Sequence, residues 1–131
     1  MIFNFDIPES NSRIIFDLVI SGKLEGVISE KAITEVKRVF SLNKNERFTH
    51  QLEQKLRKNF KVVPLYEIEK EMQELRGKIK EKDLEHLATA KHVSADYIIA
   101  FDRDFEPFKE YITPRKFVEK ILKFRPFETE Y

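Results

Sequence analysis

Apolar residues recur along the chain at two spacings, one typical of amphipathic helices and one typical of buried strands. Helical spacing marks six segments: 10–21, the segment after Ser29, 46–58, 67–76, 82–92 and the segment after Thr113. Short apolar runs predict strands at four others: 26–28, 60–65, 97–101 and 111–112. Strands separated by helices favour an α/β fold with a mostly parallel sheet covered by helices.

Glycine, proline and hydroxyl residues stand where these helices are expected to begin and end. Ser29 and Thr113 are candidate N-caps, and Pro114 takes the first position after Thr113. Gly22 closes the first helix, and Gly77 separates two later ones. The stripes predict these inward-facing side chains: Ala32, Ile33, Val36, Val39 and Phe40; Phe48, Leu52 and Leu56; Phe117, Ile121 and Phe124.

Length and composition bound the architecture and the compartment. The chain has 131 residues, of which 41% are hydrophobic, so we expect a single domain over residues 1–131 with a real core. The absence of cysteine excludes disulfides and thiolate metal sites and is typical of a reducing cytoplasm. No apolar run has the length of a membrane helix, and no segment resembles a signal peptide. The net charge of +1 gives no basic field for nucleic acid, so such a surface must be local.

The segment from Lys82 to Phe105 carries the strongest chemical signal. Asp83 lies on the apolar face of its predicted helix, and Asp102 follows the apolar run 97–101, with Asp104 two residues later. Ligands of open α/β sheets bind beyond the carboxyl ends of the strands. We therefore expect carboxylates to gather at such an edge.

A carboxylate cluster of this kind suits a hard divalent cation. Glu35 borders the apolar stripe of its helix and joins Asp83, Asp102 and Asp104 as a candidate ligand. Neighbouring carboxylates repel one another, and Mg²⁺ or Mn²⁺ relieves that repulsion through oxygen ligands. Such an ion lowers the pKa of a bound water and orients it for attack on a phosphodiester.

Each acid also has a purely structural interpretation. Glu35 can pair with Arg38 three residues on, and Asp83 can complement the dipole of its helix. Asp102 and Asp104 can be turn formers after a strand. Each acid alone favours the structural interpretation, whereas the four together, in this order on these elements, favour the functional one.

Other chemical signatures are missing from the sequence. The three glycines are isolated, so no phosphate-binding loop is present. His50, His86 and His92 lack the spacing of metal ligands and are predicted to be surface or capping residues. The basic stretch 47–61 mixes lysine and glutamate evenly and is interpreted as a solvated helix face.

The chain resembles the PIN-domain family, the fold of VapC-type toxins and related ribonucleases, over about residues 10–122. Four segments carry the resemblance: 29–40 with Glu35, 83–90 with Asp83, 97–105 with Asp102 and Asp104, and 112–117. It implies a three-layer α/β/α domain and a Mg²⁺- or Mn²⁺-dependent endoribonuclease, often dimeric and sometimes bound by an antitoxin. It also implies that Glu35, Asp83 and Asp102 are the metal-binding acids, with Asp104 as an accessory.

The sequence departs from the family pattern at two places. Ala100 stands where the family usually has Thr or Ser, two residues before the acid matched by Asp102. The first strand, which in the family ends in an Asp, has little room before the helix that starts near Ser10. Either residues 1–5 form a shortened strand with Asp6 as the first acid, or the strand lies upstream of Met1. These departures keep two alternatives open: an inactive PIN-like module that binds RNA or a protein, and a subunit whose sheet is completed by oligomerisation.

Overall fold

The computed structural model of the chain describes residues 9–42 and 45–128. Its helices and parallel strands alternate along the chain, which confirms the predicted α/β class. The chain divides into two compact units, one formed by residues 25–93 and the other by residues 1–24 and 94–131. The expected strand at residues 1–5 and its candidate acid Asp6 lie outside the described residues.

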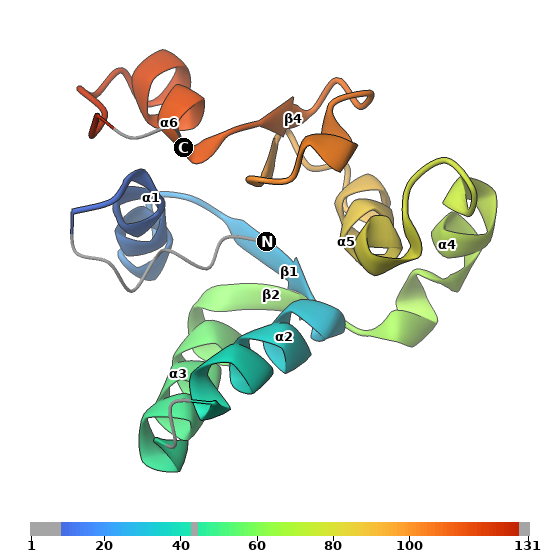
Figure 1. Ribbon diagram of the computed structural model, residues 1–131, viewed down its shortest axis with the longest axis horizontal. Coiled ribbons are helices and arrows are strands. Elements are labelled where there is room, and N and C mark those ends of the chain that lie inside the picture. The colour runs from blue at the N-terminus through green and yellow to red at the C-terminus, as the bar shows by residue number, and fades with distance from the viewer. Residues whose placement is uncertain (1–8, 43–44, 129–131) are drawn as a thin grey trace. The chain divides into compact units, whose positions relative to one another are not determined.

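The unit of residues 25–93 is built on a pair of parallel strands joined by two helices (Figure 1). Ile28 of the first strand lies opposite Val62 of the second. The elements are β1 (Gly26–Ser29), α2 (Glu30–Ser41), α3 (Glu46–Asn59), β2 (Phe60–Val63), a 3₁₀ turn (Leu65–Glu67), α4 (Glu69–Leu75) and α5 (Glu81–His92). Val63, Ile68 and Ala88 are fully buried, so β2, the turn after it and α5 share one core.

The predicted start of α2 is confirmed. Ser29 is the N-cap, and its Oγ accepts a hydrogen bond of 3.1 Å from the backbone N–H of Ala32. Gly77, between α4 and α5, has a φ of +88°, a backbone conformation that glycine adopts without strain.

Two predicted core residues of this unit are exposed. Val39 is 36% exposed because, in the last turn of α2, Phe40 is the buried residue and Val39 lies outside the buried stripe. Phe48 is 43% exposed, although its ring lies 5.7 Å from that of Phe40, because it sits in the first turn of α3, ahead of the buried Leu52. Periodicity therefore located the stripes and overestimated their width.

An ion-pair network ties α2 to α3. Arg57 of α3 donates to both carboxylate oxygens of Glu30 at 3.0 and 3.1 Å, and its Nε donates to Glu53 at 3.0 Å. Lys37 of α2 lies 3.2 Å from Glu53. The hydrogen bonds from Arg57 and then Lys37 hold the pKa of Glu53 below its ordinary value, against the opposing effect of burial.

Removing the Glu53 charge is expected to weaken the protein near neutral pH only. A lowered pKa means that Glu53 stabilises the fold above its unfolded pKa of 4.5 and loses this effect as the pH falls through its folded pKa. Glu53→Gln should lower the free energy of unfolding by about 0.5–1 kcal/mol at pH 7 and by much less at pH 3. Urea denaturation at both pH values measures this, with the exposed Glu74→Gln as the control. An equal loss at both pH values would contradict the assignment.

The unit of residues 1–24 and 94–131 contains a second parallel pair (Figure 1). Its elements are α1 (Asn11–Ile20), β3 (Ile98–Ile99), a 3₁₀ turn (Arg103–Phe105), β4 (Tyr111–Ile112), α6 (Pro114–Lys116) and a π-helical turn (Phe117–Ile121). Helix α1 packs against α6 and the π-helical turn, and Ile15 of α1 forms a buried core with Phe117 and Val118 of that turn. As predicted, Thr113 caps α6 with Pro114 at its first position, and Gly22 follows α1 with a φ of +79°.

Three predictions for this unit were wrong. The strand predicted over 97–101 is confined to β3 because its partner β4 has only two residues, and Tyr97 is 41% exposed. Ile121 and Phe124 are 39% and 49% exposed instead of buried. For Ile121 the reason is the π-helical turn, in which the N–H of Leu122 donates to the carbonyl of Phe117 and shifts the end of the helix off the expected face. Phe124 lies beyond the end of that turn, after Lys123 with a φ of +60°.

Among the residues that the structure describes, no helix is both long and apolar enough to cross a membrane.

Candidate metal centre

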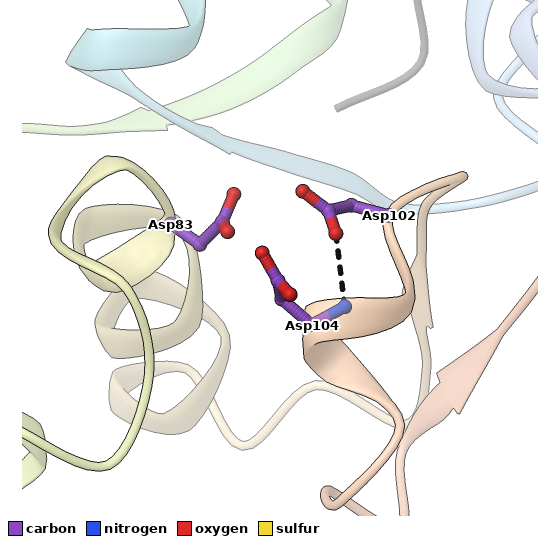
Figure 2. A group of neighbouring side chains, drawn as sticks. All are labelled: Asp83, Asp102 and Asp104. Carbon is purple, nitrogen blue, oxygen red and sulfur yellow. Dashed lines mark hydrogen bonds between the residues drawn. The ribbon is translucent and has the colours of Figure 1, made fainter.

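Two of the predicted acids lie together in one tight turn after β3. The Asp102 side chain accepts a hydrogen bond of 2.9 Å from the backbone N–H of Asp104 (Figure 2). A carboxylate oxygen of Asp102 and one of Asp104 lie within 4.8 Å of each other. The turn is anchored by Phe105, which is 1% exposed and stacks on Tyr111 with ring centres 6.4 Å apart. Asp102 therefore forms a turn, as its structural interpretation predicted. The same turn also brings the Asp104 carboxylate close to that of Asp102.

Asp83 lies in the first turn of α5 (Figure 2). Its side chain is buried, with a residue exposure of 7%, while Leu84 and Leu87 beside it are fully buried. The helix begins at Glu81, and its N-cap residue Lys80 makes no side-chain capping hydrogen bond, so acids in the first turn complement the helix dipole. Burial is unusual for an aspartate. Glu81, the other acid in the first turn of α5, is exposed, so position in that turn alone does not explain the burial of Asp83.

Glu35 is bound by a histidine that the sequence analysis had placed on the surface. His86 Nε2 lies 2.7 Å from Glu35 Oε1, and His86 Nδ1 lies 3.0 Å from Ser29 Oγ. The His86 side chain is only 12% exposed and its ring contacts Glu35 and Ser29, so the prediction of a surface or capping residue was wrong for His86. In the described part of the chain, Glu35 therefore pairs with His86 and not with Arg38, the partner that its structural interpretation had named.

The environment of Glu35 keeps it ionised. Burial opposes the charge, but the hydrogen bond from His86 and the favourable electrostatic interactions with His86 and Lys31 outweigh it, and together they hold the pKa of Glu35 below its ordinary value. Glu35 is thus an acceptor at neutral pH and can take a cation.

The starts of α2 and α5 are fixed to each other by two further contacts. The backbone N–H of Lys31 donates to Glu85 at 2.9 Å, and the Lys31 ammonium donates to the carbonyl of Lys82 at 2.8 Å. These bonds flank the Glu35–His86 pair and limit its movement. Glu35, Asp83 and His86 therefore belong to one well-tied region of the unit formed by residues 25–93.

The donor chemistry of the predicted acids fits a hard cation. All four candidate ligands offer carboxylate oxygens, the donors that Mg²⁺ and Mn²⁺ prefer. The close pair Asp102 and Asp104 places two such oxygens in one turn. Asp102 and Asp104 come from one unit and Glu35 and Asp83 from the other, so the grouping of all four stays a prediction.

The participation of His86 was the feature that the sequence analysis missed. The available signal was its place three residues after Asp83, which sets both on one side of α5. The spacing between histidines reports shared metal ligation and carries no information on a histidine that binds a carboxylate.

Comparison with known proteins identifies one relationship. A family model described as "PIN domain" matches residues 2–104, which is more than half of the chain. No curated protein and no solved structure matches the chain significantly.

Proposed function

This chain belongs to the PIN-domain family, and on that premise we propose that it is a Mg²⁺- or Mn²⁺-dependent endoribonuclease that hydrolyses RNA phosphodiesters. The observation that carries the proposal is the family match itself. It spans Glu35 and Asp83 and ends at Asp104, so it includes every acid that the sequence analysis selected. The close carboxylates of Asp102 and Asp104 support it independently.

The four acids receive distinct roles in this proposal. Asp83 and Asp102 are the principal ligands of the cation, Asp104 is an accessory ligand, and Glu35 is a ligand or positions the attacking water. When bound, a divalent cation supplies a water of lowered pKa and offsets the charge on the phosphate. The backbone N–H of Asp104 holds the Asp102 carboxylate in place, so less ordering is required when a cation binds.

A second function is favoured by one observation. Ala100 is 1% exposed and its N–H pairs with the carbonyl of Ile112, so a buried position next to the acid turn lacks the hydroxyl that the family pattern has there. The alternative is a catalytically inactive PIN-like module that binds RNA or a protein partner.

Cleavage of single-stranded RNA separates the two functions. The purified protein with Mn²⁺ should cut a fluorophore-labelled single-stranded RNA, and excess EDTA should abolish the cutting because the reaction needs the cation. Addition of Mg²⁺ or Mn²⁺ beyond the chelator should restore it. Binding of the RNA without cleavage at any Mn²⁺ concentration would reject the nuclease and support the binding module.

The partners follow from the family resemblance alone. We propose a homodimer located in the cytoplasm, with an antitoxin protein as a possible regulator. Light scattering at micromolar concentration tests the dimer, and a monomeric mass would reject it.

A further inference from the structure

The hydrogen-bonding groups around Glu35 determine where the protons of His86 lie. An ionised carboxylate only accepts, so His86 Nε2 carries the proton that it donates to Glu35 Oε1. Ser29 Oγ accepts the N–H of Ala32 and can still donate its own hydroxyl proton to an unprotonated His86 Nδ1. In the neutral ring, the Glu35 carboxylate, which only accepts, thus selects the tautomer in which Nε2 is the donor, and Ser29 donates to Nδ1.

The three residues do not form a nucleophilic triad, although their types would suit one. Ser29 is 1% exposed and its oxygen caps α2, so a substrate cannot reach it. The end of the network nearest to solvent is Glu35, whose side chain is 24% exposed, against 12% for His86. The hydrogen bonds therefore run from the buried Ser29 through His86 to the more exposed Glu35. In this arrangement Ser29 and His86 hold the Glu35 carboxylate in place.

We propose that His86, held at Nδ1 by Ser29, is the positioning residue of Glu35 in the candidate metal centre. This inference rests on the proposed function. The hydrogen bond to Oε1 fixes the carboxylate and leaves Oε2 as the oxygen offered to a cation or to its water. Ligating carboxylates are commonly held by such outer hydrogen bonds, and losing one typically costs about 10–100-fold in metal affinity or activity.

The physical gain is preorganisation. A glutamate side chain has three rotatable bonds and loses much of their freedom when it becomes a ligand. His86 imposes that loss during folding, since the surrounding bonds of Lys31 to Glu85 and to Lys82 keep α5 in place against α2. The cation then meets a carboxylate that is already ordered.

Matched histidine variants test this inference. His86→Gln keeps an N–H donor near the position of Nε2, whereas His86→Leu removes it. His92 offers a control on the same helix, because its Nδ1 lies 2.9 Å from Glu71 while it belongs to the far end of α5. His92→Leu removes a histidine–glutamate contact of the same kind away from the candidate site.

Calorimetric Mn²⁺ titration should separate these variants. We expect His86→Leu to lose at least about 10-fold in affinity, and His86→Gln and His92→Leu to stay within about 3-fold of wild type. In the Glu35→Gln background, His86→Leu should cause little further loss, because His86 acts through Glu35. Wild-type affinity in His86→Leu, or a fully additive double variant, would overturn the proposal.

A second readout uses the metal-free protein. Nitrogen chemical shifts of the His86 ring at pH 8 should report the tautomer protonated at Nε2, and Glu35→Gln should alter those shifts. A ring protonated at Nδ1 but not at Nε2 would overturn the positioning role directly. If wild type binds no Mn²⁺ but the ring has the expected tautomer, the proposed function and the cation-directed part of the inference both fail, while the hydrogen-bonded Glu35 is upheld.

Discussion

Asp102→Asn is expected to reduce RNA cleavage by at least about 100-fold while leaving the fold intact. The asparagine carbonyl oxygen can still accept the hydrogen bond that the Asp104 N–H makes to Asp102, so the turn after β3 keeps its cap. The substitution removes the negative charge, which is the property that a cation requires. Cleavage of labelled single-stranded RNA and Mn²⁺ titration measure the two consequences.

The same loss is expected for Asp83→Asn. A matched control is available before β3, at the end of the strand opposite to Asp102. Asp96 is exposed and precedes the strand, so Asp96→Asn should leave cleavage and Mn²⁺ affinity unchanged. Circular dichroism and thermal melting of each variant exclude unfolding as the cause. Equal and negligible Mn²⁺ binding in wild type, Asp83→Asn and Asp102→Asn would reject a metal-dependent enzyme.

Features set by a few neighbouring residues were predictable from the sequence. The N-caps at Ser29 and Thr113 and the positive φ of Gly22 depend on bonds within one turn, and the structure contains all three. The pairing of Asp102 with Asp104 was accessible for the same reason, since a single residue separates them and a side-chain-to-backbone turn is common for aspartate.

Features set by packing between distant segments were not predictable. The bonds of His86 to Glu35 and Ser29 span 51 and 57 residues, and no local pattern encodes them. The π-helical turn after α6 depends on a hydrogen bond from the N–H of Leu122 to the carbonyl of Phe117, five residues earlier. The predicted spacing assumed an α-helix, in which the bonded residues are four apart. Helical periodicity was therefore sound within the first turns and misplaced Ile121 and Phe124 beyond them.

The largest expected loss of stability follows from truncating Phe105. Its ring is 1% exposed and stacks on Tyr111, and its backbone N–H closes the turn onto the carbonyl of Asp102 at 3.4 Å. Phe105→Ala removes a buried aromatic ring and leaves a cavity, which costs about 3–5 kcal/mol. Since domains of this size are stable by about 5–15 kcal/mol, the variant should lose a large share of the total stability. Urea denaturation at neutral pH measures the change.

Two further variants show whether the cost comes from burial of the ring. Phe124 belongs to the same unit and is 49% exposed, so Phe124→Ala should cost less than about 1 kcal/mol. Phe105→Leu fills most of the space and should cost about 1–1.5 kcal/mol. It should also keep the Asp102 turn ordered and retain Mn²⁺ affinity near that of wild type, because the acids themselves are unchanged. A Phe105→Ala variant no less stable than Phe124→Ala would mean that Phe105 is not the buried anchor of the turn that holds both acids.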